Sequence, residues 1–130
     1  MKLALSTWNG LVAPLFDVSE KVTVAHISPC KILSRDLVDI SRLECTAKIG
    51  RLSALNIDVL ICGAISRICY DFFPGWEIRI VAFVSGPVEQ IFEALLYRKI
   101  FAWIYEPVCP EYMLTRNKET MLWLADALGE

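Results

Sequence analysis

The segment Asp58–Arg67, with the sequence DVLICGAISR, limits the possible folds of this chain more than any other segment. Its apolar run Val59–Cys62 is typical of a parallel strand that is covered on both faces. Gly63 ends the run, and Ser66 can cap a helix that follows. In open α/β sheets, ligands bind at the carboxyl ends of such strands, next to helix N-termini. The Cys62 thiol is therefore expected at a ligand-binding edge.

A second segment with the same pattern follows at Val81–Glu89, where an apolar strand runs into a Ser-Gly turn and Pro87 takes the first helical position. Two such strand ends side by side form a small pocket of backbone N–H groups. The alternative is that the turn residues only shape and cap the turns. The candidate anion contacts are the serines and glycines of both turns, namely Gly63, Ser66, Ser85 and Gly86.

The remaining pattern predicts three strands joined by turns, followed by two strands joined by helical crossovers. The predicted strands are 2–7, 21–27, 31–38, 59–62 and 77–84, and the predicted helices are 41–56, 67–73, 87–99 and 118–128. Ser41 to Glu44 has capping-box spacing, which favours a helix start there. This order predicts an α/β fold, with a mixed five-stranded sheet and helices on both faces.

Composition excludes several classes of partner. The chain has 130 residues and is 55% hydrophobic, which suits one domain with an adequate core. A net charge of −2 with scattered basic residues argues against nucleic-acid binding. No apolar run approaches the ~18 residues that a membrane helix needs, and no signal-peptide core is visible. We therefore expect a cytoplasmic protein that binds neither nucleic acid nor membrane.

The five cysteines are an odd number without a CxxC pair, which favours free thiols over a disulfide framework. Cys62 is either a soft-metal ligand at a helix N-terminus or a small buried hydrophobe. Cys45, in the first turn of a helix, and Cys30, in a turn, occupy positions that can be exposed, whereas Cys69 is expected to pack in the core. The sole histidine, His26, lies on a strand and excludes His-rich zinc sites.

Three segments of this chain, LVAPLFD (11–17), DVLICGAISR (58–67) and VSGPVEQIFEALL (84–96), resemble the dinitrogenase iron-molybdenum cofactor biosynthesis family in colinear order. The resemblance spans about residues 1–100 and implies a ribonuclease-H-like fold with strand order 3-2-1-4-5. It also implies the binding or carriage of an iron–sulfur or molybdenum-containing cluster, with cluster-assembly proteins as partners. In that strand order, the loop at Trp8 and Asn9 forms one wall of a crevice beside Cys62, and Asp17 either reaches the same edge or caps its own loop.

The residues give little support for an enzymatic function. Ribonuclease-H-like nucleases hold metal ions with strand carboxylates, but strands 2–7 and 59–62 contain neither Asp nor Glu. Neither Ser66 nor Cys62 has a base next to it, and no G-x-G-x-x-G motif is present. We therefore expect a protein that is not an enzyme.

Residues 101–130 form a C-terminal extension beyond the 1–100 domain, with an aromatic segment and an amphipathic helix. Its large aromatic side chains, Trp103, Tyr105, Tyr112 and Trp123, must pack back on the domain or on a partner, as in a homodimer. Cys109 is a candidate second thiol near the crevice, if this segment crosses the carboxyl edge of the sheet.

These observations leave three functional hypotheses open. A cluster carrier requires an exposed Cys62 or Cys109 in the crevice, whereas an interaction module that docks through its tail predicts buried thiols and a filled crevice. A thiol redox protein requires two cysteines with Cα atoms within ~7 Å. The candidate cluster contacts are Trp8, Asn9, Cys62, Gly63, Ser66, Ser85 and Gly86, and the candidate metal ligands are Cys62 and Cys109.

Overall fold

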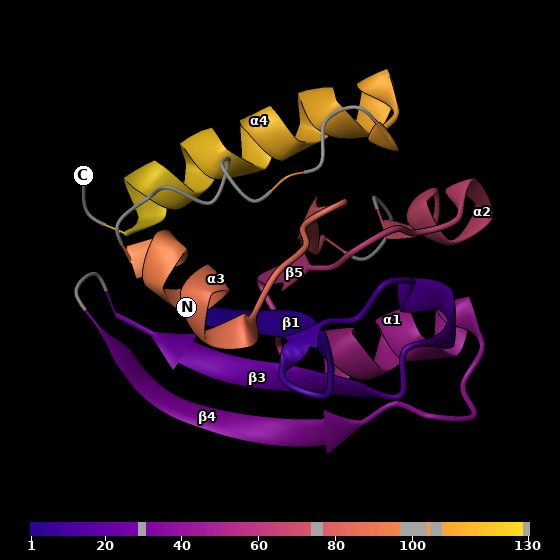
Figure 1. Ribbon diagram of the computed structural model, residues 1–130, viewed down its shortest axis with the longest axis horizontal. Coiled ribbons are helices and arrows are strands. Elements are labelled where there is room, and N and C mark those ends of the chain that lie inside the picture. The colour runs from indigo at the N-terminus through magenta and orange to yellow at the C-terminus, as the bar shows by residue number, and fades with distance from the viewer. Residues whose placement is uncertain (29–30, 74–76, 97–103, 105–107, 129–130) are drawn as a thin grey trace.

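A computed structural model describes residues 1–28, 31–73, 77–96, 104 and 108–128 (Figure 1). Cys30, Trp103, Tyr105 and the predicted helix end at 97–99 lie outside these residues. Within the described ranges, no helix is long and apolar enough to cross a membrane.

One mixed sheet forms the centre of the molecule. Its strands are β1 (Lys2–Trp8), β2 (Leu11–Val12), β3 (Lys21–Ile27), β4 (Ile32–Asp39), β5 (Val59–Ile61) and β6 (Arg79–Val81). Their order is β4-β3-β1-β5-β6, and β2 pairs with β1 off this path. β5 is parallel to both β1 and β6, whereas β3 is antiparallel to both β1 and β4. The predicted α/β architecture with a mixed open sheet is confirmed.

The expectation of five strands is wrong, because β2 adds a sixth and changes the numbering of the order. The hairpin between β1 and β2 was not predicted. Its turn places Asn9 and Gly10 at positive φ (50° and 77°), a conformation that both residue types tolerate.

Helices cover both faces of the sheet (Figure 1). They are α1 (Cys45–Ala54), α2 (Arg67–Tyr70), α3 (Val88–Leu96) and α4 (Glu111–Ala127), with a short 3-10 turn, η1, at Phe16–Val18. Side chains alternate along β1, so Ala4 packs with α1 and α2, whereas Leu3 and Leu5 pack with α3. α4 contributes to both cores, through Met113 on one side and Leu124 on the other.

Some predicted boundaries are wrong for local reasons. α1 begins at Cys45 rather than near Ser41, because the Ser41 N–H donates to the Asp39 carboxylate at 2.7 Å and Arg42 takes a positive φ of 62°. β6 is shorter than the predicted strand 77–84, because Glu77 and Phe83 also take positive φ, at 58° and 63°. α4 begins at Glu111, about two turns earlier than predicted, and Pro110 precedes it.

α4 is joined to the end strand of the sheet by buried side chains. Asn117 accepts a hydrogen bond from the Ala82 N–H and donates one to the Ala82 carbonyl, both at 2.9 Å. Thr120 donates to the Ile80 carbonyl at 3.0 Å. The described part of the C-terminal tail thus packs on its own sheet, and a homodimer through this tail stays a prediction.

Candidate thiol and carboxylate site

The predicted crevice beside Gly63 is filled by the chain itself. A Cβ atom on Gly63 would clash with the backbone carbonyl oxygens of Ala13 and Pro14. The Ala64 N–H donates to the Pro14 carbonyl at 2.9 Å, and the Phe16 N–H donates to the Ala64 carbonyl at 2.8 Å. The loop after β2 therefore lies directly on the turn after β5, and only glycine allows so close an approach.

Both candidate metal ligands named from the sequence are buried. Cys62 is 0% exposed and Cys109 is 9% exposed, and both belong to the core on the α1 and α2 side of the sheet. The carrier hypothesis required an exposed thiol at one of these positions, but Cys62 packs in the core and α4 packs over Cys109. Burial raises the pKa of the Cys62 thiol, with smaller contributions from Asp17 and Cys109. Cys62 therefore stays protonated at neutral pH.

The other predicted contact residues lie at the start of α2 and around the β1–β2 hairpin. Ser66 caps α2, since its Oγ accepts a hydrogen bond from the Cys69 N–H at 3.1 Å. Trp8 (57% exposed) and Asn9 line an open groove together with Arg35 and Glu89.

The exposed Ser85 and the adjacent Gly86 belong to the second predicted turn. Gly86 is tied to the β1–β2 hairpin, because its carbonyl accepts a hydrogen bond from the Val12 N–H at 2.9 Å. Gly63 and Ser66 thus follow Cys62 in the turn after β5, whereas Gly86 contacts the β1–β2 hairpin.

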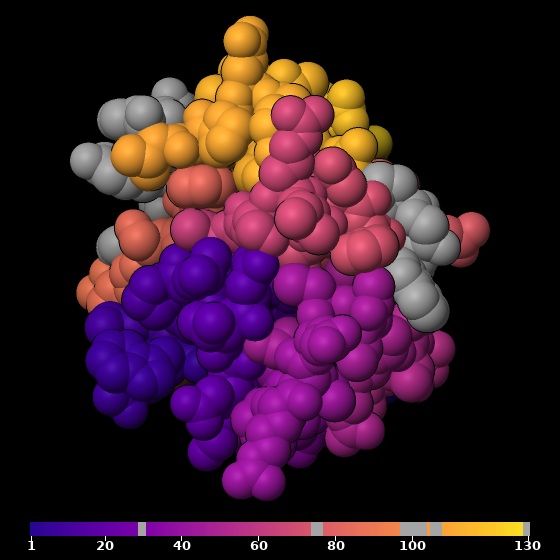
Figure 2. Space-filling view, turned by 90° about the vertical axis from the view of Figure 1, so that its right-hand side faces the viewer, coloured from indigo at the N-terminus to yellow at the C-terminus, as the bar shows by residue number. Residues whose placement is uncertain are grey.

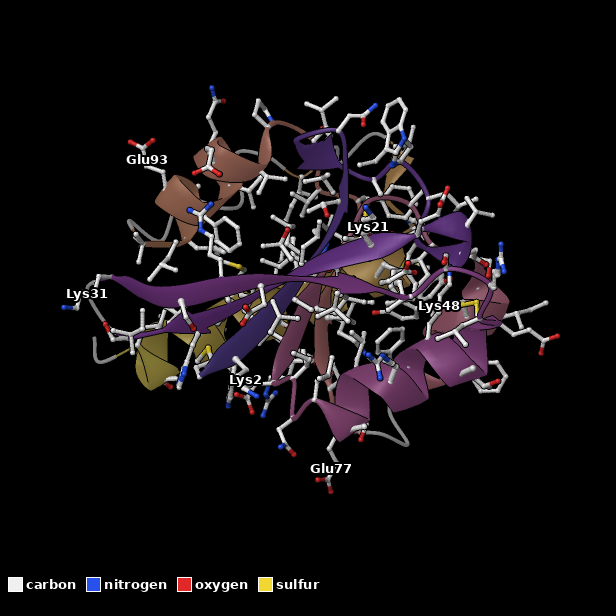
Figure 3. All side chains as sticks on the ribbon, turned by 90° about the horizontal axis from the view of Figure 1, so that it is seen from below. Lys2, Lys21, Lys31, Lys48, Glu77 and Glu93 are labelled. Atoms are coloured by element: carbon white, nitrogen blue, oxygen red, sulfur yellow. A yellow bond between two sulfur atoms is a disulfide. The ribbon has the colours of Figure 1, made fainter. Side chains whose placement is uncertain are left out.

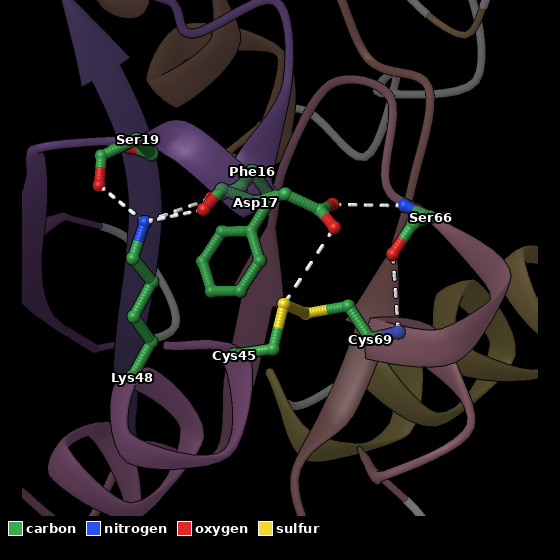
Figure 4. The surroundings of a disulfide bond; sticks show 7 residues. All are labelled: Phe16, Asp17, Ser19, Cys45, Lys48, Ser66 and Cys69. Carbon is green, nitrogen blue, oxygen red and sulfur yellow. Dashed lines mark hydrogen bonds between the residues drawn. A yellow bond between two sulfur atoms is a disulfide. The ribbon is translucent and has the colours of Figure 1, made fainter. Parts of the chain in front are cut away.

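A disulfide joins Cys45 to Cys69, with their Cα atoms 5.4 Å apart (Figure 4). The expectation that these cysteines are free thiols is wrong. Cys45 is the first residue of α1 and is partly buried, whereas Cys69 lies in α2 and is 0% exposed. The two cysteines are 24 residues apart in sequence and meet because both helices begin near the same end of the sheet.

The Asp17 carboxylate lies against this disulfide. Its Oδ1 accepts a hydrogen bond from the Ser66 N–H at 2.9 Å, and its Oδ2 lies 3.6 Å from the Cys45 Sγ. Asp17 therefore reaches the edge of the sheet, one of the two alternatives that the sequence left open. Within the described part of the chain, the ligand atoms of Asp17, Cys45 and Cys69 all lie within 4.8 Å of one another.

A buried lysine holds the segment that carries Asp17. The Lys48 ammonium donates to the carbonyls of Phe16 (3.3 Å), Asp17 (2.8 Å) and Ser19 (2.7 Å), and the residue is only 2% exposed. In Figure 3, Lys31 and Glu77 point away from the ribbon, whereas Lys48 lies within it. Burial lowers the pKa of Lys48, while Asp17 and Glu20 act in the opposite direction.

No family model matches the sequence, and no curated protein matches it. Several solved structures do. PH0822 superposes with a TM-score of 0.72 at 17% identity, covering 76% of this chain and 91% of that one. A candidate dinitrogenase from Methanocaldococcus jannaschii superposes with a TM-score of 0.63 at 17% identity, covering 76% of this chain and 90% of that one. The likeness is one of fold.

The orange protein of Desulfovibrio gigas, in its apo form, has the same kind of similarity. It superposes with a TM-score of 0.63 at 17% identity, covering 75% of this chain and 88% of that chain. These neighbours support the resemblance seen in the sequence at the level of the fold.

Sequence reasoning missed the Cys45–Cys69 pair but placed its surroundings correctly. It located Cys45 in the first turn of a helix and identified Ser66 as the cap of the helix that carries Cys69. The signal available was therefore two cysteines near two helix starts. The path of the chain from β4 into α1 decides which two helix starts lie next to each other, and no local pattern encodes that path.

Proposed function

We propose that this protein is a non-catalytic binding or carrier protein for an iron–sulfur or molybdenum-containing cluster, held by Cys45 and Cys69 in their reduced form together with Asp17. The observation that carries the proposal is the grouping of two sulfur atoms and a carboxylate within 4.8 Å. Thiolates are the ligands that iron–sulfur clusters and other soft metal centres prefer. Because Cys45 is only partly buried, the site can be reached from solvent.

The fold neighbours support this class of function. One is named a candidate dinitrogenase and another is the orange protein, whose structure is of the apo form. A ribonuclease-H-like arrangement of the sheet, a role related to nitrogen fixation, cluster-assembly proteins as partners and a cytoplasmic location belong to the same proposal.

Cys45 and Cys69 replace Cys62 and Cys109 as the proposed ligands. A metal binds the thiolate rather than the thiol, and burial raises the pKa of Cys62. Cys109 is buried beneath α4, with its Sγ 3.9 Å from the Asn117 Nδ2. Both of these cysteines are buried in the core, whereas reduction of the Cys45–Cys69 disulfide frees one sulfur, that of Cys45, which is only partly buried.

Anaerobic reconstitution tests the proposal. The full chain is reduced with dithiothreitol, desalted and incubated with iron and sulfide, or separately with tetrathiomolybdate. Charge-transfer absorption that remains after a second desalting reports binding. We expect it in the wild type and in the Cys62→Ala and Cys109→Ala variants, and we expect its loss in Cys45→Ser and Cys69→Ser. Circular dichroism confirms that each variant is folded.

Two outcomes would contradict the proposal. If the absorption survives in Cys45→Ser and Cys69→Ser but is lost in Cys62→Ala or Cys109→Ala, the ligand assignment is wrong. If the reduced and folded wild type retains neither iron nor molybdenum, the carrier function itself is wrong.

A second candidate, an interaction module without bound metal, is favoured by one observation. The buried thiols of Cys62 and Cys109 and the filled turn at Gly63 are what that hypothesis predicted. Leu122 of α4 is also 72% exposed. Light scattering tests this reading for a homodimer: a dimer that Leu122→Glu dissociates supports it, and a monomeric wild type contradicts it.

A further inference from the structure

We propose that the Cys45–Cys69 disulfide is a reversible thiol–disulfide exchange site and that an incoming thiol attacks the sulfur of Cys45. This activity goes beyond cluster binding, because it involves no metal and can be tested on the chain alone. The Cα separation of 5.4 Å meets the requirement that the sequence analysis set for a thiol redox protein, although with cysteines it did not select.

Access to solvent determines which sulfur is attacked. Cys45 is partly buried and lies between two exposed residues, Glu44 and Thr46, at the start of α1. Cys69 is 0% exposed and lies in the core on the α1 and α2 side. An attacking thiolate must approach the sulfur in line with the bond that breaks, and access is one of the factors that set the rate of exchange. The structure therefore leaves Cys45 as the reachable sulfur.

The exchange needs only a thiol as reductant. A first thiolate forms a bond to the Cys45 Sγ, the Cys45–Cys69 bond breaks, and its electron pair stays on the Cys69 Sγ, which takes up a proton. A second thiolate then attacks the external sulfur of the mixed disulfide and releases Cys45 as a thiolate, which is also protonated. In total, two thiols are oxidised to one disulfide and the protein disulfide is reduced to a dithiol.

Asp17 makes this exchange sensitive to the charge of the thiol. Its Oδ2 lies 3.6 Å from the Cys45 Sγ, so a negatively charged reductant meets a like charge at the point of attack. A disulfide sulfur carries no hydrogen, so this contact becomes a hydrogen bond only in the dithiol form, when the Cys45 S–H can donate. The Ser66 N–H and Lys48 hold Asp17 by contacts that do not involve the disulfide.

The bond between α1 and α2 is also placed where its opening leaves the core intact. Figure 2 shows the segment around α2 between α4 and the N-terminal half of the chain. α2 stays attached on its own, because Ser66 caps it and Tyr70 packs edge-on against Tyr112 of α4, with ring centroids 5.5 Å apart. The dithiol form is therefore expected to keep the native fold, which a reversible exchange site requires.

Reduction kinetics of the native chain test the proposal. The full chain, with Cys30→Ser so that position 30 takes no part in the reaction, is incubated without denaturant with cysteamine (a cation) or 3-mercaptopropionate (an anion), and new thiols are counted over time. Each rate is divided by that of the same thiol with the neutral hydroxyethyl disulfide. We expect native-state reduction, with cysteamine favoured about three- to tenfold after this correction. In Asp17→Asn, which can still accept from the Ser66 N–H, this preference should fall towards one.

A second experiment identifies the attacked sulfur. With oxidised glutathione, Cys69→Ser should form a mixed disulfide at Cys45, detected by peptide mass spectrometry, whereas native Cys45→Ser should form none at Cys69. The proposal is overturned if the wild-type disulfide resists reduction until denaturant is added, or if the mixed disulfide forms at Cys69. It is also overturned if Asp17→Asn leaves the charge preference unchanged. None of these outcomes depends on whether a cluster binds.

Discussion

Asn117 forms a two-way hydrogen bond with the backbone of Ala82, accepting from its N–H and donating to its carbonyl, each at 2.9 Å. The Asn117 side chain is 0% exposed, so neither group of Ala82 can turn to water instead. α4 is thereby attached to the strand end that precedes the second predicted turn.

Replacing Asn117 should destabilise the protein strongly. Asn117→Ala removes both bonds and leaves two buried backbone groups of Ala82 without a partner, so the free energy of unfolding should fall by about 2–4 kcal/mol. Urea unfolding followed by circular dichroism measures this change. The matched control is the exposed Lys118→Ala on the same helix, which should change stability by less than about 0.5 kcal/mol. Equal effects of the two variants would contradict the role assigned to Asn117.

Gly63 should tolerate no side chain. Gly63→Ala forces a methyl group against the carbonyl oxygens of Ala13 and Pro14, which should lower the free energy of unfolding by about 3 kcal/mol. Gly10→Ala, at φ +77° with no atom within 4 Å of the added Cβ, should lower it by only about 1 kcal/mol. Thermal unfolding of the two variants side by side tests the difference, and a reversed ranking would show that the loop does not rest on Gly63.

Tyr70 should make stability fall at alkaline pH. Burial raises the pKa of Tyr70 from 10.0 to about 12, so the unfolded chain loses this proton at lower pH than the native chain does. The free energy of unfolding should therefore decrease as pH rises from 10 towards 12, more steeply in the wild type than in Tyr70→Phe. Unfolding curves across this range give both slopes, and identical slopes would contradict the assignment.

The same substitution should not weaken the protein at neutral pH. Among the described residues, the Tyr70 hydroxyl is buried and makes no hydrogen bond. Tyr70→Phe removes this unsatisfied group, so stability at pH 7 should stay unchanged or rise by about 1 kcal/mol. The more exposed Tyr112→Phe is the control.

Reduction of the disulfide should lower stability without unfolding the chain. A cross-link between cysteines 24 residues apart limits the unfolded state and contributes about 3–4 kcal/mol in the chain-entropy model. Urea unfolding of the wild type with and without dithiothreitol measures this contribution. The Cys45→Ala/Cys69→Ala double variant should not respond to dithiothreitol; a similar response there would mean that the reductant acts elsewhere.

The sequence predicted the central strands well because their signal is local. The run at Val59, the glycine turn and the Ser66 cap all follow from neighbouring residues, and the structure places them as predicted. The predicted start of α1 was wrong because Ser41 donates to the Asp39 carboxylate. A capping box requires this serine to be available to the helix.

The sequence pointed to Cys62 and Cys109, which are buried, whereas the thiol and carboxylate group that the structure forms contains Cys45, Cys69 and Asp17. Cys62 sits at the end of its strand, as predicted, yet the loop after β2 covers the turn beside it. Cys45 and Cys69 come together through the packing of two helices on a third segment, which carries Asp17. Contacts of this kind depend on tertiary packing and leave no periodicity in the sequence.

The attachment of α4 has a consequence for how copies of this chain can associate. Thr120 is hydrogen-bonded to the backbone of β6, and Asn117 is hydrogen-bonded to the residue that follows this strand. The β6 edge of the sheet is therefore closed to a further strand. β4 lies at the opposite edge of the path and is eight residues long. Among the described strands, β4 is therefore the one open end of the path, and a sheet with one open edge can join a single copy of itself strand to strand, so growth into a fibre stops at a pair.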